Sequence, residues 1–277
     1  MKVAETIAEM KQLRSGCPEP VAFVPTMGYL HYGHLSLVRR ARAENRTVIA
    51  SIFVNPTQFS PNEDFASYPR NTEHDLAMLE NEKTDIVFMP SASEIYPPGF
   101  DSWVEAGKLG ERLEGVSRPT HFRGVTTVVA RLFSIIRPTK AYFGQKDSQQ
   151  LLIIRKLVSD LNMDLEIVTC PTVRESDGLA MSSRNSYLNP EERRAAAVLY
   201  QSLELAQQLW SQGEKDAEKI RLEMKNLIQH QPLANIDYIS IADKETLEEL
   251  DEVKPQALVS LAVKIGKPRL IDNIILE

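Results

Sequence analysis

Two histidines beside a glycine form the most specific chemical pattern in the sequence. His31 and His34 lie three residues apart, after an apolar stretch at 21–24 and at the start of an amphipathic segment. The apolar stretch is typical of a buried strand, which we expect Pro25 to end, and the apolar spacing after His34 predicts a helix. Because N–H groups at a helix N-terminus attract anions, the loop and its two imidazoles predict a phosphate-binding site.

A zinc site is a weaker interpretation of the same pair. Helical histidine ligands usually stand four residues apart with a third ligand nearby. The sequence has only three other histidines, none of them close to His31 and His34. A pair of ordinary surface histidines at a helix start is the remaining alternative.

Two further polar segments could bind phosphates. Lys146 and Asp147 follow an apolar stretch at 140–144, which places them at a predicted strand-to-helix turn. From such a turn, the lysine could reach a phosphate and the aspartate could accept hydrogen bonds from ribose hydroxyls. Residues 172–185 are small and polar with little to bury, which favours an exposed, mobile loop. Within this stretch, residues 181–185 (MSSRN) combine hydroxyls with a guanidinium suited to a pyrophosphate group. Each segment alone is more typical of an ordinary polar loop. The turn that contains Lys146 and Asp147, however, is predicted to lie at the same edge of the sheet as His31 and His34.

Two glutamines and a third histidine are less specific. Gln58 follows an apolar stretch at 47–54, and Gln150 lies in the helix that Asp147 opens. A glutamine is usually solvated, but in a closed site its neutral amide binds hydroxyl and carboxylate groups. His121 belongs either to a basic cluster or to the protein's structural histidines.

The composition limits the class of protein. The net charge of −6 argues against nucleic-acid binding, which needs a basic surface. No apolar run is long enough to span a membrane, and the N-terminus resembles an amphipathic helix rather than a signal peptide. Cys17 and Cys170 form no metal or disulfide motif, which fits a reducing compartment. We therefore expect a soluble, cytoplasmic protein that binds neither nucleic acid nor a membrane.

Strand-like and helix-like segments alternate through the first part of the chain. This alternation predicts an α/β fold with a doubly wound, parallel, Rossmann-like sheet. The expected strands are 21–24, 47–54, 85–90, 140–144 and 165–169, and the expected helices follow His34 and cover 71–80, 124–137 and 148–159. Between 91 and 124 we expect a long loop with a short strand near 103–104.

The C-terminal part has a different order of elements. Two helices precede three strands, which predicts a smaller α+β domain, and we place the boundary near residue 175. The expected helices are 190–211 and 215–230, with a short acidic one at 245–250, and the expected strands are 236–241, 257–263 and 269–276.

Five segments, in this order, resemble the pantothenate synthetase (pantoate–β-alanine ligase) family. HYGH at 31–34 is similar to the HxGH signature of the nucleotidyltransferase and class I aminoacyl-tRNA synthetase superfamily, whose members attack the α-phosphate of ATP. MSSRN resembles the KMSKS loop of that superfamily, with Ala180 where its first lysine would stand. The five segments are PTMGYLHYGH at 25–34, FVNPTQF at 53–59, HFRGV at 121–125, YFGQKDSQQ at 142–150 and SSRNSYL at 182–188.

The resemblance implies a homodimeric, Mg²⁺-dependent ligase. It would join (R)-pantoate to β-alanine through a pantoyl adenylate and cleave ATP to AMP and pyrophosphate. Residues 1–175 would bind ATP and pantoate, and residues 176–277 would form a lid. Asp75 and Asp147 are possible metal contacts.

The resemblance also assigns site residues. His34 would be the catalytic acid, supported by His31 and Lys146. Gln58 and Gln150 would bind pantoate, with Gln58 also near β-alanine. The implied ATP-binding residues are Met27, Gly28, Tyr29, Leu30, His31, Tyr32, Gly33, His34, Gly144, Gln145, Lys146, Asp147, Val173 (through its backbone), Met181, Ser182, Ser183 and Arg184. Gln145 stands where members often carry glutamate, and Tyr32 where an aspartate or a small residue is common.

Two other functions remain open at this stage. One is another adenylyl-transferring enzyme of the superfamily, including one that charges tRNA, although the acidic charge and the lack of an anticodon-type domain argue against tRNA. The other is a non-catalytic nucleotide-binding module, which would not need a phosphate-gripping loop or two neutral amides beside the phosphates.

Overall fold

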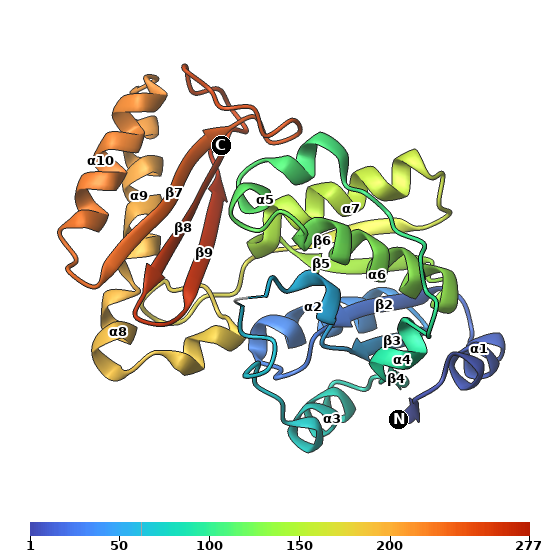
Figure 1. The fold of residues 1–277 in the computed structure, drawn as a ribbon. Coiled ribbons are helices and arrows are strands. Elements are labelled where there is room, and N and C mark those ends of the chain that lie inside the picture. The colour runs from blue at the N-terminus through green and yellow to red at the C-terminus, as the bar shows by residue number, and fades with distance from the viewer. Residues whose placement is uncertain (62) are drawn as a thin grey trace. The chain divides into compact units, whose positions relative to one another are not determined.

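The chain divides into two units (Figure 1). Each unit has hydrophobic clusters of its own. A computed structural model describes residues 1–61 and 63–277. Unit 1 comprises Met1–Gln145 and Gln149–Pro171, and unit 2 comprises Lys146–Ser148 and Thr172–Glu277. The sequence-based boundary lay near residue 175.

Unit 1 contains a six-stranded, fully parallel sheet in the order β1-β4-β3-β2-β5-β6. The strands are β1 (Lys2–Ala4), β2 (Val21–Thr26), β3 (Thr47–Ile52), β4 (Ile86–Phe88), β5 (Lys140–Gly144) and β6 (Glu166–Cys170). The chain winds outward from β2 in both directions, so the strand order reverses beside β2. Such a switch point is where open α/β sheets bind ligands, outside the carboxyl ends of the strands.

Both faces of this sheet are buried, which explains the continuous apolar runs. Val21 and Phe23 of β2 pack in one hydrophobic cluster, and Ala22 and Val24 pack in another. Successive strand residues point to opposite faces, so a strand covered on both sides must be apolar throughout. The helices are α1 (Ile7–Ser15), α2 (Tyr32–Glu44), α3 (Thr72–Asn81), α4 (Ala92–Ile95), α5 (Glu114–Ser117), α6 (His121–Ile136) and α7 (Ser148–Asp160), with short 3₁₀ turns η1 (Pro56–Gln58), η2 (Gly107–Glu111) and η3 (Gln145–Asp147).

Unit 2 packs helices against an antiparallel sheet of three strands in the order β7-β8-β9. Figure 1 shows α9 and α10 along one side of this sheet. Apolar residues of both helices share one core with β8. The elements are η4 (Ser183–Tyr187), α8 (Pro190–Ala195), α9 (Val198–Ser211), α10 (Ala217–Gln229), β7 (Ala234–Ala242), β8 (Leu258–Ile265) and β9 (Arg269–Ile275). The predicted parallel α/β sheet with a smaller α+β part is confirmed.

Several local predictions for unit 1 were wrong. Pro25 does not end β2, because the strand continues to Thr26 and Pro25 stays in register with Ser51 of β3. The expected strand at 103–104 is absent from the described structure. The Val104 N–H instead donates to Thr127 Oγ1 of α6 at 3.0 Å, so a side chain takes the place of a strand partner. The N-terminal residues form edge strand β1 before α1 begins.

Unit 2 also differs from the expectations. The expected helix at 245–250 is a turn that returns to β7, with Leu250 N–H donating to the Ile241 carbonyl at 2.9 Å. The carboxylate of Asp243 shapes this turn by accepting the backbone N–H of Thr246 at 2.9 Å. The expected helix at 190–211 is divided between α8 and α9. The stretch at 172–185 is less exposed than predicted, because Leu179 is buried in the unit 2 core.

No helix in the described ranges is both long and apolar enough to cross a membrane.

Candidate active site

The two histidines of the first motif cap α2. His31 is the N-cap residue, and its Nδ1 accepts the Gly33 N–H at 3.1 Å. His34 lies three residues later, and its Nδ1 accepts the His31 N–H at 3.3 Å. The imidazole centroids lie 4.0 Å apart. Two imidazoles thus form the reciprocal arrangement that a serine and a glutamate usually form in a capping box.

This cap fixes the tautomer of both rings. A ring nitrogen that accepts a hydrogen bond carries no proton, so the proton of each neutral imidazole lies on Nε2. The two Nε2–H groups lie on the ring edges opposite the cap. The cap therefore leaves each imidazole with an Nε2–H donor, which can bind a phosphate oxygen.

The loop between β2 and α2 is clamped by Asp75 of α3. This side chain is 1% exposed, and its two oxygens accept the N–H groups of Tyr29 and Leu30, each at 2.7 Å. Burial raises the pKa of the Asp75 carboxyl, and these two N–H donors oppose that rise. The carboxylate is therefore committed to the loop backbone, which argues against Asp75 as a primary metal ligand.

Gly28 allows the loop to approach Asp75. Its φ is +81°, and a Cβ there would lie 3.0 Å from both Asp75 Oδ2 and Ile52 Cγ2. Tyr29 follows with a φ of +50°. The N–H groups of Tyr29, Leu30, His31 and Gly33 all donate within the loop or to Asp75, so our expectation that loop N–H groups would collect the anion is corrected for these four.

Gln58 lies beside the histidine loop. Its Nε2 is 3.0 Å from Met27 Sδ, and its Oε1 accepts from Asn55 Nδ2 at 3.2 Å. The side chain is 8% exposed. Since β2 and β3 are neighbouring parallel strands, the loops at their carboxyl ends bring two of the predicted site segments together.

A buried polar network that we did not predict holds Gln58. Asn55 is 1% exposed, donates to the Gly124 carbonyl at 3.1 Å and accepts from the Tyr96 hydroxyl at 2.8 Å. A Cβ on Gly124 would lie 2.4 Å from the Thr57 carbonyl oxygen, so α6 can touch η1 only through glycine. The Asn–Pro pair after a buried strand was the available signal for this turn.

His121 is a structural histidine, which decides between the two interpretations of its role. Its Nδ1 lies 2.8 Å from the Gln58 carbonyl, and its Nε2 lies 3.2 Å from Arg118 Nη1. Since a guanidinium only donates, Nε2 accepts and Nδ1–H donates to Gln58. Burial, with the Arg118 charge, lowers the pKa of His121 to about 4. Arg118 is in turn paired with Glu63.

The third loop of unit 1 begins at the end of β5. Gly144 is the last strand residue, and Gln145 begins η3. Gln150 is half-buried on α7. Its neighbour Gln149 is buried, and its amide donates to the carbonyls of Leu109 and Arg112, each at 2.7 Å. Of these two adjacent glutamines, Gln149 therefore has a structural role.

The remaining predicted residues lie in unit 2. The Met181 N–H donates to the Val173 carbonyl at 3.0 Å, so these two residues are adjacent. Ser182 caps η4 by accepting the Arg184 N–H at 3.3 Å, and Ser183 is buried. The Lys146 carbonyl accepts from Asn273 Nδ2 at 2.8 Å. The predicted site residues are thus shared between the units: residues 27–34, Gln58, Gly144, Gln145 and Gln150 belong to unit 1, and Lys146, Asp147, Val173 and 181–184 belong to unit 2.

The described residues contain no group of three or more histidine, cysteine, aspartate or glutamate side chains suited to a metal ion. Asp147 is exposed at the end of η3.

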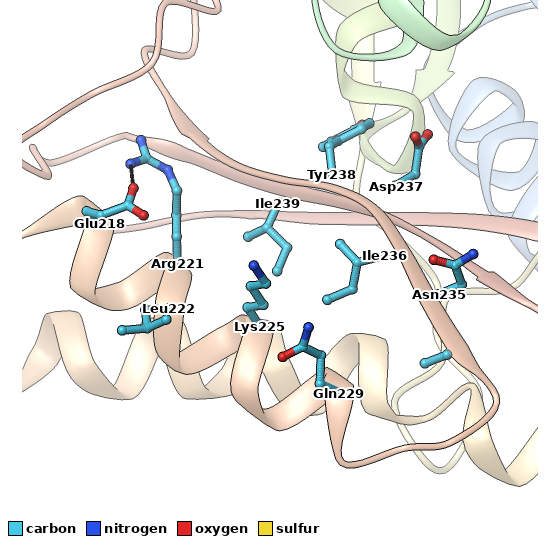
Figure 2. Close-up of a pocket in the computed structure, with 11 residues that line it drawn as sticks. Glu218, Arg221, Leu222, Lys225, Gln229, Asn235, Ile236, Asp237, Tyr238 and Ile239 are labelled. Atoms are coloured by element: carbon cyan, nitrogen blue, oxygen red, sulfur yellow. Dashed lines mark hydrogen bonds and ion pairs between the residues drawn. The ribbon is translucent and has the colours of Figure 1, made fainter.

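A separate cavity of about 480 Å³ lies between α10 and β7 of unit 2. Figure 2 shows Leu222, Lys225 and Gln229 of α10 on one side and Ile236 and Ile239 of β7 on the other. None of the predicted site residues lines it, and its polar groups include the ion pair between Arg221 and Glu218. We therefore do not assign the site to this cavity.

Comparisons with known proteins agree on one family. The family model described as Pantoate-beta-alanine ligase matches residues 2–275. A pantothenate synthetase from Roseiflexus sp. (strain RS-1) is 57% identical over 277 residues, covering 100% of both chains. One from Herpetosiphon aurantiacus is 58% identical, also covering 100% of both chains.

Solved structures give the same result. The crystal structure of pantothenate synthetase from Thermus thermophilus aligns with a TM-score of 0.95 at 47% identity, covering 99% of both chains. A pantoate-beta-alanine ligase from Francisella tularensis, complexed with beta-gamma ATP and beta-alanine, aligns with a TM-score of 0.82 at 36% identity, covering 99% of this chain and 97% of that one. The resemblance stated from five sequence segments is confirmed, and the chain belongs to the pantoate–β-alanine ligase family.

Proposed function

We propose that this chain condenses (R)-pantoate with β-alanine to form pantothenate through a pantoyl adenylate, with AMP and pyrophosphate as the other products. The observation that supports this most directly is the histidine pair at the carboxyl end of β2, whose two Nδ1 atoms accept backbone N–H groups, in a chain of this family. The Francisella tularensis relative, which was solved with an ATP form and beta-alanine, supports ATP as the substrate here.

The first half-reaction follows from the donors available. A pantoate carboxylate oxygen attacks the α-phosphorus of ATP, the bond to the bridging oxygen breaks, and pyrophosphate leaves with the electron pair. Negative charge grows on the α-phosphate oxygens and on the bridging oxygen. Preorganised donors at these positions stabilise the transition state more than the ground state. We assign this role to the Nε2–H groups of His31 and His34. His34, the catalytic acid implied by the resemblance, would then act toward the leaving group as a hydrogen-bond donor that keeps its proton.

The second half-reaction uses the activated acyl group. The β-alanine amine attacks the carbonyl carbon of the anhydride, the acyl–phosphate C–O bond breaks and AMP leaves, and the amine loses a proton. We assign Gln58 and Gln150 to pantoate, with Gln58 also near β-alanine. We assign Gly144, Gln145 and Asp147 to ATP, together with Lys146, Val173 and residues 181–184.

Mg²⁺, dimerisation and a cytoplasmic location complete the proposal. Mg²⁺ usually keeps several waters and is held mainly through substrate phosphates, so it needs no cluster of protein ligands. This mode fits a described structure in which no such cluster occurs and Asp75 is committed to backbone donors. When bound, the ion would neutralise charge on the phosphates. We expect a homodimer, as the family resemblance implies.

Exchange of labelled pyrophosphate into ATP tests this proposal. With pantoate and Mg²⁺ present and β-alanine absent, we expect exchange, because the adenylate forms before the amine is needed. Exchange that requires β-alanine would contradict the adenylate route. Exchange with another carboxylic acid but not with pantoate would indicate a different adenylyl-transferring enzyme, and ATP binding without any exchange would indicate a non-catalytic module.

A further inference from the structure

Lys146 is held from a distant strand. It lies in η3, between β5 and α7, but its backbone carbonyl accepts from the side chain of Asn273 in β9 at 2.8 Å. Asn273 is 3% exposed and lies 127 residues further along the chain. This contact agrees with the division into units. Lys146–Ser148 belongs to unit 2, although the strand before it, β5, and most of the helix after it, α7, belong to unit 1.

Asn273 is itself fixed by an ion pair. Its N–H donates to Asp272 Oδ1 at 2.8 Å, and Asp272 is 1% exposed. Both carboxylate oxygens of Asp272 accept from Arg174, at 2.6 Å and 3.1 Å. Burial raises the pKa of the Asp272 carboxyl, and the positive charges of Arg174 and Lys146 oppose this rise. A buried carboxylate with a bidentate guanidinium is a rigid support, because removing either partner leaves a charge uncompensated.

The same arginine organises the second phosphate segment. Arg174 donates to the Gly178 carbonyl at 3.0 Å and forms a backbone bridge with Ala180. Its guanidinium lies 4.1 Å from the centroid of the Tyr200 ring. The bridge leads directly into residues 181–184, and the Met181 N–H bonds the Val173 carbonyl beside it. The cluster of Arg174, Asp272 and Asn273 therefore anchors two segments. One is the turn that contains Lys146, and the other is the start of the loop at 181–184.

We propose that Asn273 is a positioning residue that acts through Lys146, holding its peptide so that the ammonium meets the triphosphate in concert with residues 181–184. This inference rests on the proposed function of the site. Lys146 is then positioned by unit 2, although the chain reaches it from β5. Loss of the Asn273 donor should misplace the ammonium during adenylation and leave the later attack by β-alanine almost unchanged.

Asn273→Ala tests the proposal in the full chain. The variant loses the donor to the Lys146 carbonyl but keeps the backbone bonds of β9. We expect pyrophosphate–ATP exchange to fall about 3- to 10-fold, the range for one neutral hydrogen bond. The reaction of preformed pantoyl adenylate with β-alanine should stay within about 2-fold of wild type, because pyrophosphate has already left. Equal losses in both half-reactions would overturn the inference.

Ser260→Ala is the matched control. Ser260 lies opposite Asn273 on β8, is 4% exposed, and its hydroxyl has no hydrogen-bond partner among the described residues. The substitution perturbs the same part of the sheet without touching Lys146, so exchange should remain at the wild-type rate. If Asn273→Ala does not fold, Asn273→Ser retains a polar group that is too short to replace the amide donor, and the same loss is expected.

A double-mutant cycle separates positioning from a general structural effect. Once Lys146→Ala has removed the ammonium, adding Asn273→Ala should cause little further loss of exchange. Losses that multiply would show that Asn273 acts independently of Lys146, and the inference would be wrong. If wild-type enzyme shows no exchange, the proposed function itself fails. Normal exchange in both wild type and Asn273→Ala overturns only the inference.

Discussion

Acidification should destabilise unit 1 through His121. Both nitrogens of this ring are committed, one to the Gln58 carbonyl and the other to Arg118. A second proton would have to enter on Nε2, facing the guanidinium. Burial and the Arg118 charge therefore lower the pKa of His121 from 6.5 to about 4.

The sign and size of the effect follow from linkage. Below its ordinary pKa of 6.5, His121 takes up a proton in the unfolded chain, but the folded chain resists until about 4. The stabilisation is therefore complete above 6.5 and is lost as the pH falls towards 4. Each unit of pKa difference corresponds to about 1.4 kcal/mol, so the loss is about 3 kcal/mol of unfolding free energy.

Comparison with His121→Asn isolates this residue from other titrating groups. The Asn amide can still donate to the Gln58 carbonyl, but it does not titrate and no longer accepts from Arg118. Near pH 7.5 we expect the variant to be about 1–2 kcal/mol less stable than wild type. By about pH 4 this difference in unfolding free energy should disappear or reverse. Only wild type carries His121, so only wild type loses the stability that depends on the unprotonated ring.

Urea unfolding at several pH values measures this difference. The sequence has two tryptophans, Trp103 in unit 1 and Trp210 in unit 2, so a Trp210→Phe background restricts the fluorescence signal to unit 1. His230→Asn is the control, because it removes an exposed histidine of unit 2 and leaves the contacts of His121 in place. A gap between wild type and His121→Asn that stays constant from about pH 7.5 to about pH 4 would refute the reasoning.

Three further predictions concern the loops at the sheet edge. His34→Ala should lower the exchange rate about 10²–10³-fold and the unfolding free energy by only about 1 kcal/mol, for the lost cap contact to the His31 N–H, and near-normal exchange would contradict its role. Gly124→Ala should lower the unfolding free energy by about 1–3 kcal/mol and raise the KM for pantoate, because the new Cβ would lie 2.4 Å from the Thr57 carbonyl. Asp75→Asn should slow exchange about 10- to 100-fold, because an amide nitrogen would face a loop N–H. Exchange that matches wild type in this variant would show that the clamp is dispensable.

Five of the six strands of the parallel sheet, β2 to β6, were predictable because each carries its own signal. Val21 to Val24 and the stretch from 47 are apolar throughout, which a strand covered on both faces requires. The failures are segments whose backbone partners come from elsewhere in the chain. Val104 bonds a threonine of α6, and Lys2–Ala4 joins β4 as an edge strand. Such pairings depend on tertiary contacts that hydrophobic periodicity does not encode.

The same distinction applies to the site. The motif segments at 25–34, 53–59 and 142–150 could be placed at strand ends because each begins in or directly after an apolar stretch that forms a strand. Their supports could not, because each lies far along the chain from the residue it holds. Asp75 bonds Leu30 from 45 residues away, and His121 reaches Gln58 across 63. The sequence around a single aspartate or histidine does not indicate which distant backbone group its side chain will hydrogen-bond.

The histidine pair shows how such support determines chemistry. Asp75 holds the loop N–H groups of Tyr29 and Leu30, which turns these donors inward. The next donors, those of His31 and Gly33, are taken by the two Nδ1 atoms. Protonation of either Nδ1 would break the cap, so this conformation requires neutral imidazoles that donate through Nε2. The phosphate binding that we propose at this helix start would therefore depend on two side chains with a fixed tautomer, and replacing either histidine would remove a donor that these four N–H groups are not positioned to replace.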